Sequence, residues 1–303
     1  MSELPKSVEI VEVAARDGIQ NERKILSVDT KLDLIRRAID AGARRLEVTS
    51  FVNPKRVPQM ADADELAARL PRGRARYVGL ALNAKGFERA VAAGLDEANF
   101  VVVASDTFNR RNQGVGTEDT LAAWAEIAQA AKGRIGTGLT VGAAFGCPFE
   151  GEVPLARLLE VIERAMAHPP DELALADTIG VATPAEVIER VGAVRRAFPE
   201  VPIRLHLHNT RNTGLANAWA GIMAGAVTLD SSLGGVGGCP FAPRATGNIP
   251  TEDLVYMLER AGIATGLDLD ACIEAAEWLE AQLEHTLPGM VMKAGGFPAP
   301  EAA

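Results

Sequence analysis

Apolar and polar positions along this chain follow two alternating patterns. Short apolar runs are typical of buried strands, and the longer segments between them carry apolar residues at helical spacing. The runs predict eight strands, at residues 8–13, 44–51, 77–82, 98–104, 135–145, 172–176, 203–210 and 226–231. The other segments predict helices at residues 29–41, 63–70, 84–93, 117–132, 154–167, 184–198, 213–224, 251–261 and 269–283, with a polar loop at 105–112 and a glycine-rich loop at 234–250.

The regular alternation of strand and helix indicates the α/β class, with parallel strands joined by right-handed crossovers. Eight such units in 303 residues favour a closed (β/α)₈ TIM barrel over an open doubly wound sheet. A dinucleotide-binding sheet would carry Gly-x-Gly-x-x-Gly after its first strand, where this chain has Arg16-Asp17-Gly18. No linker divides the chain, so we expect residues 1–303 to form one TIM-barrel domain with an extra C-terminal helix.

The composition of the chain limits its possible binding partners and the cellular compartment in which we expect it. A net charge of −9 without a basic cluster argues against nucleic acid and anionic membranes as partners. The first residues lack the apolar run of a signal peptide, and no stretch approaches the roughly 20 apolar residues of a membrane span. Cys147, Cys239 and Cys272 form no Cys-x-x-Cys pair, which favours a reducing compartment. We therefore expect a cytoplasmic protein.

The residues best suited to chemistry follow the ends of four predicted strands. In a TIM barrel the active site lies at the C-terminal ends of the strands, and the first, second, seventh and eighth strands are neighbours around a closed barrel. His206 and His208 are two residues apart on one strand, so both imidazoles point to the same face. The candidate site residues that these strands bring to one side of the barrel are Arg16, Asp17, Glu47, His206, His208, Cys239 and Asn248.

A carboxylate, two imidazoles and an amide oxygen suit Mg²⁺ or Mn²⁺, because this donor set contains no thiolate. Asp17, His206, His208 and Asn248 would leave positions open for a substrate. Each residue also has a simpler interpretation. Asp17 could be a turn or capping residue, Asn248 a cap for the helix that follows, and the two histidines a hydrogen-bonded pair.

Three further residues could have functional roles next to such a metal ion. Arg16 could neutralise a developing enolate, or it could simply pair with Asp17. Glu47, inside a buried strand, could hold Arg16 in place, and a structural ion pair would place it similarly. Cys239 lies among glycines, where its thiol could act as an acid or base, or be a small buried apolar residue.

Several segments resemble 3-hydroxy-3-methylglutaryl-CoA lyase, a family of the DRE-TIM metallolyase superfamily. Arg16-Asp17-Gly18 and His206-Leu207-His208 are shared across that superfamily, whereas Gly237-Gly238-Cys239-Pro240 is more specific to the lyase branch. The matching segments are residues 16–22, 49–55, 57–60, 176–180, 206–208, 237–242 and 246–248, in order along nearly the whole chain.

The resemblance implies a TIM-barrel lyase that performs a retro-Claisen cleavage, taking 3-hydroxy-3-methylglutaryl-CoA to acetyl-CoA and acetoacetate, as in leucine degradation. It implies Mg²⁺ or Mn²⁺ on Asp17, His206, His208 and Asn248, and a homodimer. It further implies that Arg16 stabilises the thioester enolate, that Glu47 supports the site, and that His206 or Asp17 takes part in proton transfer. Cys239 would lie on a loop that closes over the substrate. Substrate contacts are expected from Arg16, Gln20, Arg211, Arg110 and Arg111, with Lys55 and Lys85 as further candidates for the CoA phosphates.

Three departures from the family pattern leave the acyl group open. Arg211 stands where Tyr is usual, Ala15 where Pro is usual, and Asp106 where Glu is usual. Alternatives are a lyase for citramalyl-CoA or for an isoprenoid-substituted 3-hydroxyglutaryl-CoA, and a pyruvate aldolase or Claisen synthase on the same barrel. A barrel retained only as a binding protein is a third class, against which the full ligand set argues.

Overall fold

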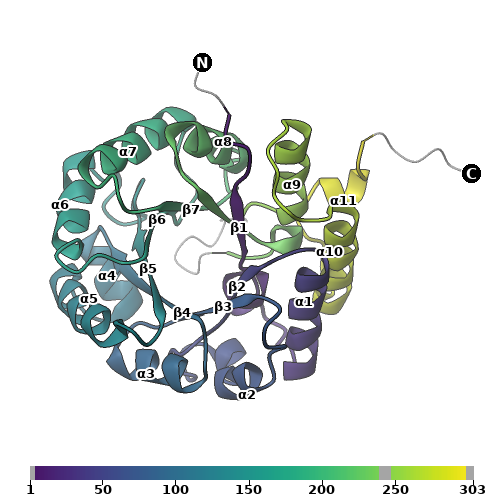
Figure 1. Ribbon diagram of the computed structural model, residues 1–303, viewed down its shortest axis with the longest axis horizontal. Coiled ribbons are helices and arrows are strands. Elements are labelled where there is room, and N and C mark those ends of the chain that lie inside the picture. The colour runs from purple at the N-terminus through teal and green to yellow at the C-terminus, as the bar shows by residue number, and fades with distance from the viewer. Residues whose placement is uncertain (1–3, 239–246, 298–303) are drawn as a thin grey trace, which may run out of the picture.

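The eight apolar runs form a closed parallel barrel in the computed structural model, which describes residues 4–238 and 247–297 (Figure 1). The strands are β1 (Glu9–Glu12), β2 (Arg45–Ser50), β3 (Arg76–Leu80), β4 (Glu97–Val103), β5 (Gly136–Gly142), β6 (Glu172–Asp177), β7 (Ile203–Leu207) and β8 (Thr228–Ser231). Each strand pairs in parallel with the next, and β8 pairs with β1 to close the ring. The predicted TIM barrel is confirmed.

Helices form the outer ring around the strands (Figure 1). They are α1 (Val28–Asp40), α2 (Ala63–Ala68), α3 (Ala84–Ala92), α4 (Asp106–Gln113), α5 (Thr117–Ala131), α6 (Leu155–Ala165), α7 (Pro184–Ala197), α8 (Gly214–Ala224), α9 (Thr251–Arg260), α10 (Leu269–Leu283) and α11 (Val291–Ala294). Short turns of other helix types are η1 (Ala14–Gly18), η2 (Pro58–Met60) and η3 (Leu233–Gly235). Of these, α10 packs against α1, α9 and η3, so it covers the side of the barrel where the first and last strands pair.

One predicted loop was wrong, because residues 105–112 lie largely within α4. The Ser105 hydroxyl caps this helix by accepting a hydrogen bond from the Phe108 amide at 3.1 Å, and Gly114 ends it in the left-handed conformation. Only Phe108 and Asn109 of the helix are buried. A polar helix with so narrow a buried face has no apolar periodicity, which is why the sequence pattern concealed it.

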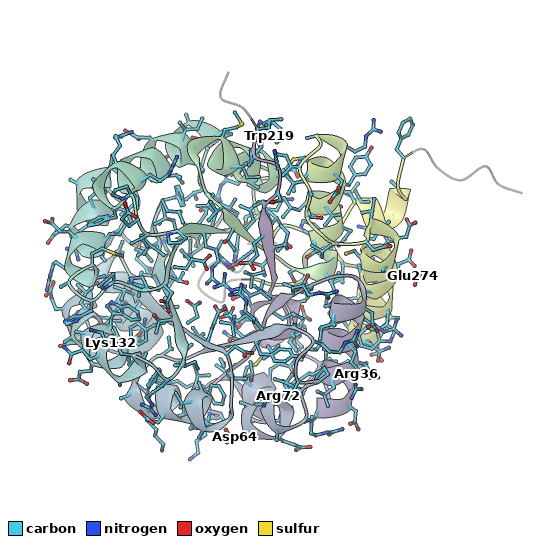
Figure 2. All side chains as sticks on the ribbon, in the orientation of Figure 1. Arg36, Asp64, Arg72, Lys132, Trp219 and Glu274 are labelled. Atoms are coloured by element: carbon cyan, nitrogen blue, oxygen red, sulfur yellow. The ribbon has the colours of Figure 1, made fainter. Side chains whose placement is uncertain are left out.

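The two faces of the strands have opposite character. On β2, Leu46 and Val48 face the helices and belong to the apolar core, whereas Arg45 points into the barrel. There Arg45 contacts Glu97 of β4 at 2.6 Å and Glu172 of β6 at 2.8 Å, and all three residues are buried. Figure 2 shows side chains filling the centre of the barrel. The interior is therefore a column of paired charges, where most TIM barrels have branched apolar residues.

Across residues 4–238 and 247–297, no helix has both the length and the apolar character needed to cross a membrane.

Candidate active site and metal centre

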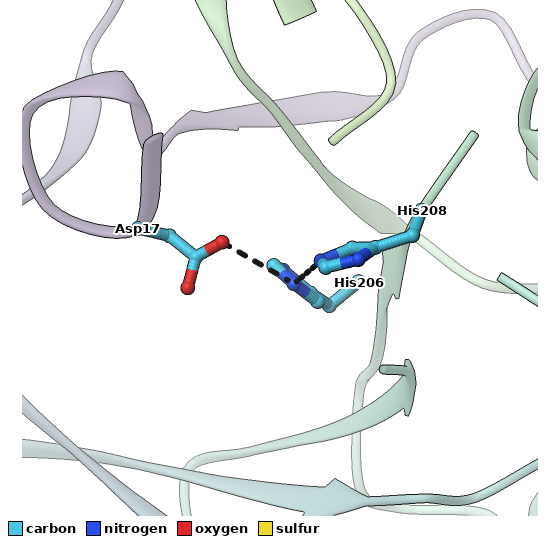
Figure 3. A group of neighbouring side chains, drawn as sticks. All are labelled: Asp17, His206 and His208. Atoms are coloured by element: carbon cyan, nitrogen blue, oxygen red, sulfur yellow. Dashed lines mark hydrogen bonds and ion pairs between the residues drawn. The ribbon is translucent and has the colours of Figure 1, made fainter. Parts of the chain in front are cut away.

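Three of the predicted ligands meet at the C-terminal end of the barrel. Asp17 lies on η1, directly after β1, while His206 is on β7 and His208 follows it. One ligand atom from each of the three residues lies within 4.8 Å of the other two. His206 Nε2 is 3.1 Å from His208 Nε2 and 3.8 Å from Asp17 Oδ2, and Figure 3 shows the three side chains pointing at one another.

The orientation of the two imidazoles fits a divalent cation. His206 Nδ1 lies 3.0 Å from Asp230 Oδ2, which assigns the ring proton to Nδ1 and leaves a lone pair on Nε2. That lone pair faces His208 Nε2. Adjacent ligands on an octahedral Mg²⁺ or Mn²⁺ ion lie about 3 Å apart when each is about 2.1 Å from it. The spacing of the two nitrogens is therefore that of neighbouring ligands to one ion.

Asn248 completes the group from the other end of the chain. Its Nδ2 donates hydrogen bonds to Asp17 Oδ2 at 3.0 Å and to the Val236 carbonyl at 3.2 Å. Its Oδ1 is buried and has no hydrogen-bond partner among the described residues, so this acceptor is free for a cation. A Cβ on Gly247 would lie 2.6 Å from the Gly237 carbonyl oxygen, so glycine is required for this close approach. The alternative role of Asn248 as a cap is not observed for α9.

Arg16 is the cation of the site, and two carboxylates hold it. Its Nε donates to Glu47 Oε2 at 2.8 Å and its Nη1 to Asp17 Oδ1 at 2.6 Å. Burial opposes its charge, but Glu47 and Asp17 outweigh burial and raise its pKa, so Arg16 stays protonated. Burial likewise opposes the charge of Asp17, but Arg16 and the two imidazoles hold the pKa of this carboxyl well below its usual range. Both ions are therefore present at neutral pH.

Comparison with known proteins shows which family the chain belongs to. The sequence pattern described as HMGL-like matches residues 7–279. The chain is 44% identical to the (R)-citramalyl-CoA lyase of Chloroflexus aurantiacus, covering 96% of this chain and 95% of that one. It is 38% identical to a hydroxymethylglutaryl-CoA lyase of Bacillus subtilis, with 94% and 96% covered. A solved HMG-CoA lyase of Acinetobacter baumannii, in complex with coenzyme A and 3-methylmalate, superposes with a TM-score of 0.94 at 39% identity, covering 100% of both chains.

The chain belongs to the HMGL-like family. The resemblance read from its motifs is thereby confirmed, and the HMGL-like match spans all eight strands together with η1 and η3.

The two histidines of this HMGL-like protein differ in acidity. Burial and the neighbouring His206 lower the pKa of His208 to about 4, so its imidazole is neutral at physiological pH, the form that binds metals. Burial also opposes the charge of His206, but its hydrogen bond to Asp230 and the charge of Asp17 outweigh burial and raise its pKa. Within the described residues, His206 Nδ1 faces the Asp230 carboxylate whereas His208 Nδ1 has no hydrogen-bond partner, which accounts for the difference.

The other predicted substrate contacts are spread around the mouth of the barrel. Gln20 follows η1, and its buried Oε1 has no hydrogen-bond partner within the described ranges. Arg211 Nη1 donates to the Ile179 carbonyl at 3.1 Å and the Gly180 carbonyl at 2.8 Å, so part of its guanidinium is held on the loop after β6. Cys239 lies outside the described residues.

Four basic side chains predicted to meet the CoA phosphates are exposed and lie on α3, on α4 and in the loop after β2. Arg110 and Arg111 are on α4, where Arg110 Nε pairs with Asp106 at 2.7 Å and the Arg111 guanidinium lies 4.1 Å from the ring centre of Phe149. Lys55 lies in the loop after β2 and Lys85 in the first turn of α3. None of the four belongs to the elements that carry the candidate ligands.

Two buried glutamates accept hydrogen bonds from the backbone behind the site, and neither was predicted from the sequence. Glu12 accepts hydrogen bonds from the amides of Ala14 at 2.8 Å and Leu233 at 3.1 Å, which begin η1 and η3 respectively. Glu252 accepts one from the Gly234 amide at 3.0 Å. A carboxylate within an apolar strand was the signal that picked out Glu47, and the same signal applies to Glu12.

The stability of the protein should fall as pH rises, in part because of Glu252; burial also raises the pKa of Glu12, to about 7, which acts in the same direction. Burial raises the pKa of Glu252 from the ordinary 4.5 to about 8, while the hydrogen bonds to backbone amides only partly offset it. Between pH 4.5 and 8 the unfolded chain therefore loses a proton that the native protein keeps. We expect Glu252→Gln to abolish a loss on the order of 3 kcal/mol in unfolding free energy between pH 5 and 8.5.

Urea denaturation at both pH values measures this effect, with Glu277→Gln on the exposed face of α10 as the control. The same pH dependence in wild type and Glu252→Gln would contradict the assignment of a protonated Glu252.

Proposed function

We propose that this HMGL-like protein is a divalent-metal-dependent lyase that cleaves a carbon–carbon bond in a branched 3-hydroxyacyl-CoA. The observation that supports this most directly is the contact between Arg16 and Asp17. It places a permanent cation next to a donor set that fits a metal ion. A retro-Claisen cleavage needs both, because it removes a proton from a hydroxyl and leaves negative charge on a thioester oxygen.

The proposed metal site comprises Asp17, His206, His208 and Asn248, which together offer a carboxylate, two imidazoles and an amide oxygen. A bound Mg²⁺ or Mn²⁺ would supply Lewis acidity that makes the tertiary hydroxyl of the substrate easier to deprotonate. Asn248 Oδ1 is available to the ion without loss of a protein contact, since it has no hydrogen-bond partner in the described part of the chain.

Arg16 has the role of binding the enolate. When the hydroxyl loses its proton, the carbinol carbon becomes a ketone and the electrons of the broken bond move onto the thioester as an enolate. The Arg16 guanidinium would donate hydrogen bonds to that oxygen, while Glu47 keeps the guanidinium oriented through Nε. We assign the proton acceptor to Asp17, because both ring nitrogens of His206 are already committed to Asp230 and the metal site. We assign the acid that protonates the enolate carbon to Cys239.

The CoA part of the substrate has a candidate position beside η1. A pocket of about 650 Å³ lies there, lined by Asn21, Glu22, Arg23, Lys24, Leu283, Glu284 and His285. Two of its side chains, Arg23 and Lys24, are cations suited to phosphate groups, and Lys24 Nζ pairs with Glu284 at 2.7 Å, a contact that a phosphate would replace. Asn21 Nδ2 donates to the Gly238 carbonyl at 2.8 Å, so this pocket adjoins the glycine-rich loop. Arg110 and Arg111 on α4 stay predictions as further contacts to the CoA phosphates. A homodimeric state and a cytoplasmic location stay predictions.

The proposed substrate is 3-hydroxy-3-methylglutaryl-CoA, with citramalyl-CoA as the second candidate, favoured by the 44% identity to the Chloroflexus enzyme. The two acyl groups differ by one methylene between the carbinol carbon and the carboxylate. Both would present the same thioester and hydroxyl to Arg16 and the metal, so the ligand geometry suits either. One methylene changes substrate preference by roughly 10- to 200-fold, a difference that kinetics will resolve.

The test is product release from each thioester by the purified protein with Mg²⁺. Acetoacetate with acetyl-CoA from the glutaryl thioester, at a kcat/KM at least tenfold above that for citramalyl-CoA, would support the first assignment. Pyruvate formed preferentially from citramalyl-CoA would replace it with the second. Cleavage of neither thioester by metal-loaded protein would argue against both.

Chelation should abolish the reaction without unfolding the protein. We expect EDTA to remove all measurable turnover and added Mn²⁺ or Mg²⁺ to restore it, because the hydroxyl would otherwise keep its ordinary, very high pKa. Circular dichroism of the treated protein serves as the control for folding. Full activity after exhaustive chelation would contradict the metal assignment.

A further inference from the structure

Asp230 on β8 makes one close contact with the candidate metal site and few elsewhere. Its Oδ2 lies 3.0 Å from His206 Nδ1. Its Oδ1 is buried and makes no hydrogen bond within the described residues, with Arg204 Nε at 3.4 Å as its nearest cationic neighbour. Asp230 is 4% exposed and thus cut off from solvent. Its hydrogen-bonding capacity is therefore directed at His206.

Arg204 connects this carboxylate to the charged interior of the barrel. Arg204 and His206 are two residues apart on β7, so both point into the barrel. Arg204 Nη1 lies 3.6 Å from Glu172, which in turn contacts Arg45 at 2.8 Å. Acidic and basic side chains thus alternate from the floor of the barrel up to His206. A buried carboxylate without a cation nearby would be costly, and Arg204 supplies that cation.

We propose that Asp230, held by Arg204, is the positioning residue that fixes the tautomer and orientation of His206. This inference rests on the proposed metal site. By accepting the Nδ1 proton, Asp230 keeps the lone pair of His206 on Nε2, the atom that faces His208 and Asp17. Carboxylates behind metal-bound histidines act this way, and their loss weakens metal binding by roughly 10- to 100-fold. The charged column inside the barrel therefore serves the site as well as the fold.

Asp230→Asn separates positioning from structural support. In this variant Arg204 favours the amide oxygen on its own side, so the amide N–H₂ faces His206 Nδ1. An N–H donor at that position forces the proton onto Nε2 and removes the lone pair from the metal site. We expect the variant to bind Mn²⁺ roughly 10- to 100-fold more weakly than wild type, as measured from free Mn²⁺ by electron paramagnetic resonance.

Glu97→Gln is the matched control, because it makes the same chemical change in the same interior but contacts Arg45 and Arg76 in place of His206. If the column were only structural, both variants would lower Tm and neither would change the affinity for Mn²⁺. Wild-type affinity in folded Asp230→Asn would overturn the proposal. Absence of Mn²⁺ binding by wild-type protein would instead overturn the metal site itself, so the two failures are distinguishable.

Arg204→Gln tests the same arrangement if Asp230→Asn does not fold. This change frees Asp230 from its cation without touching His206. We expect a loss of several-fold in Mn²⁺ affinity, smaller than that of Asp230→Asn because the acceptor for Nδ1–H remains. Affinity equal to that of wild type would remove Arg204 from the proposal.

Discussion

Replacing Arg16 with Gln should lower kcat by about 10²- to 10³-fold at saturating metal and substrate, the size of effect seen when a preorganised donor to a developing oxyanion is removed. The buried guanidinium is fixed between Glu47 and Asp17 before substrate arrives, so it pays no cost of reorientation as the enolate forms. Single-turnover measurement of acetyl-CoA formation tests this directly, since it reports the cleavage step rather than product release.

The matched control for Arg16→Gln is Arg74→Gln, which removes an exposed guanidinium from the loop before β3, where it pairs with Asp40 at 2.9 Å. We expect Arg74→Gln to stay within a few-fold of wild type. A similar loss in both variants would indicate a general effect of charge on acyl-CoA binding, and wild-type turnover in Arg16→Gln would refute its role at the enolate.

Asp17→Asn should reduce both metal affinity and turnover by about 100-fold or more, exceeding the loss caused by a residue behind the ligands. Asp17 is the only anionic ligand in the proposed set, and its charge offsets that of the ion. The variant keeps the size of the side chain, and Arg16 keeps its contacts with Glu47, so we expect folding to be retained. Titration with Mn²⁺, followed by turnover across a wide range of metal concentration, measures both effects.

High Mn²⁺ concentration provides the internal control for Asp17→Asn. If the variant acts through metal affinity, millimolar Mn²⁺ should recover part of the lost turnover. Unchanged Mn²⁺ affinity in a folded, inactive variant would remove Asp17 from the ligand set and leave it a role beside Arg16 alone.

The barrel was predictable because each strand carries apolar residues at least on the face towards the helices, and strands and helices alternate regularly along the chain. The strand ends were less predictable. The run at 135–145 contains β5 only over Gly136–Gly142, because Ala143 adopts a left-handed turn conformation that ends the strand. Residues 105–112 were mistaken for a loop since only Phe108 and Asn109 of α4 are buried. Burial on so small a face depends on packing partners that are distant in sequence.

The ligand candidates were predictable for a related reason. Strand order places the ends of β1, β7 and β8 together, so a motif at each end is enough to bring Asp17 near His206. Asp230 carries the same signal as Glu47, a carboxylate inside a predicted strand, but it was missed because its role depends on His206 across the strand pair. Sequence patterns identify residues that bind or react themselves. A residue that acts by positioning another can be recognised only when the structure shows where both side chains lie.

The hydrogen bond between Asn248 and Asp17 joins positions 231 residues apart, across the seam where β1 and β8 meet. A chain that lacks its last strand cannot assemble this pair, so the binding centre exists only after the ring has closed. A partly folded chain would offer the two histidines without Asp17 and Asn248, so full metal affinity would indicate that the barrel had closed. Once bound, the ion would link the chain after β1 to the ends of β7 and β8 and so stabilise the closed ring.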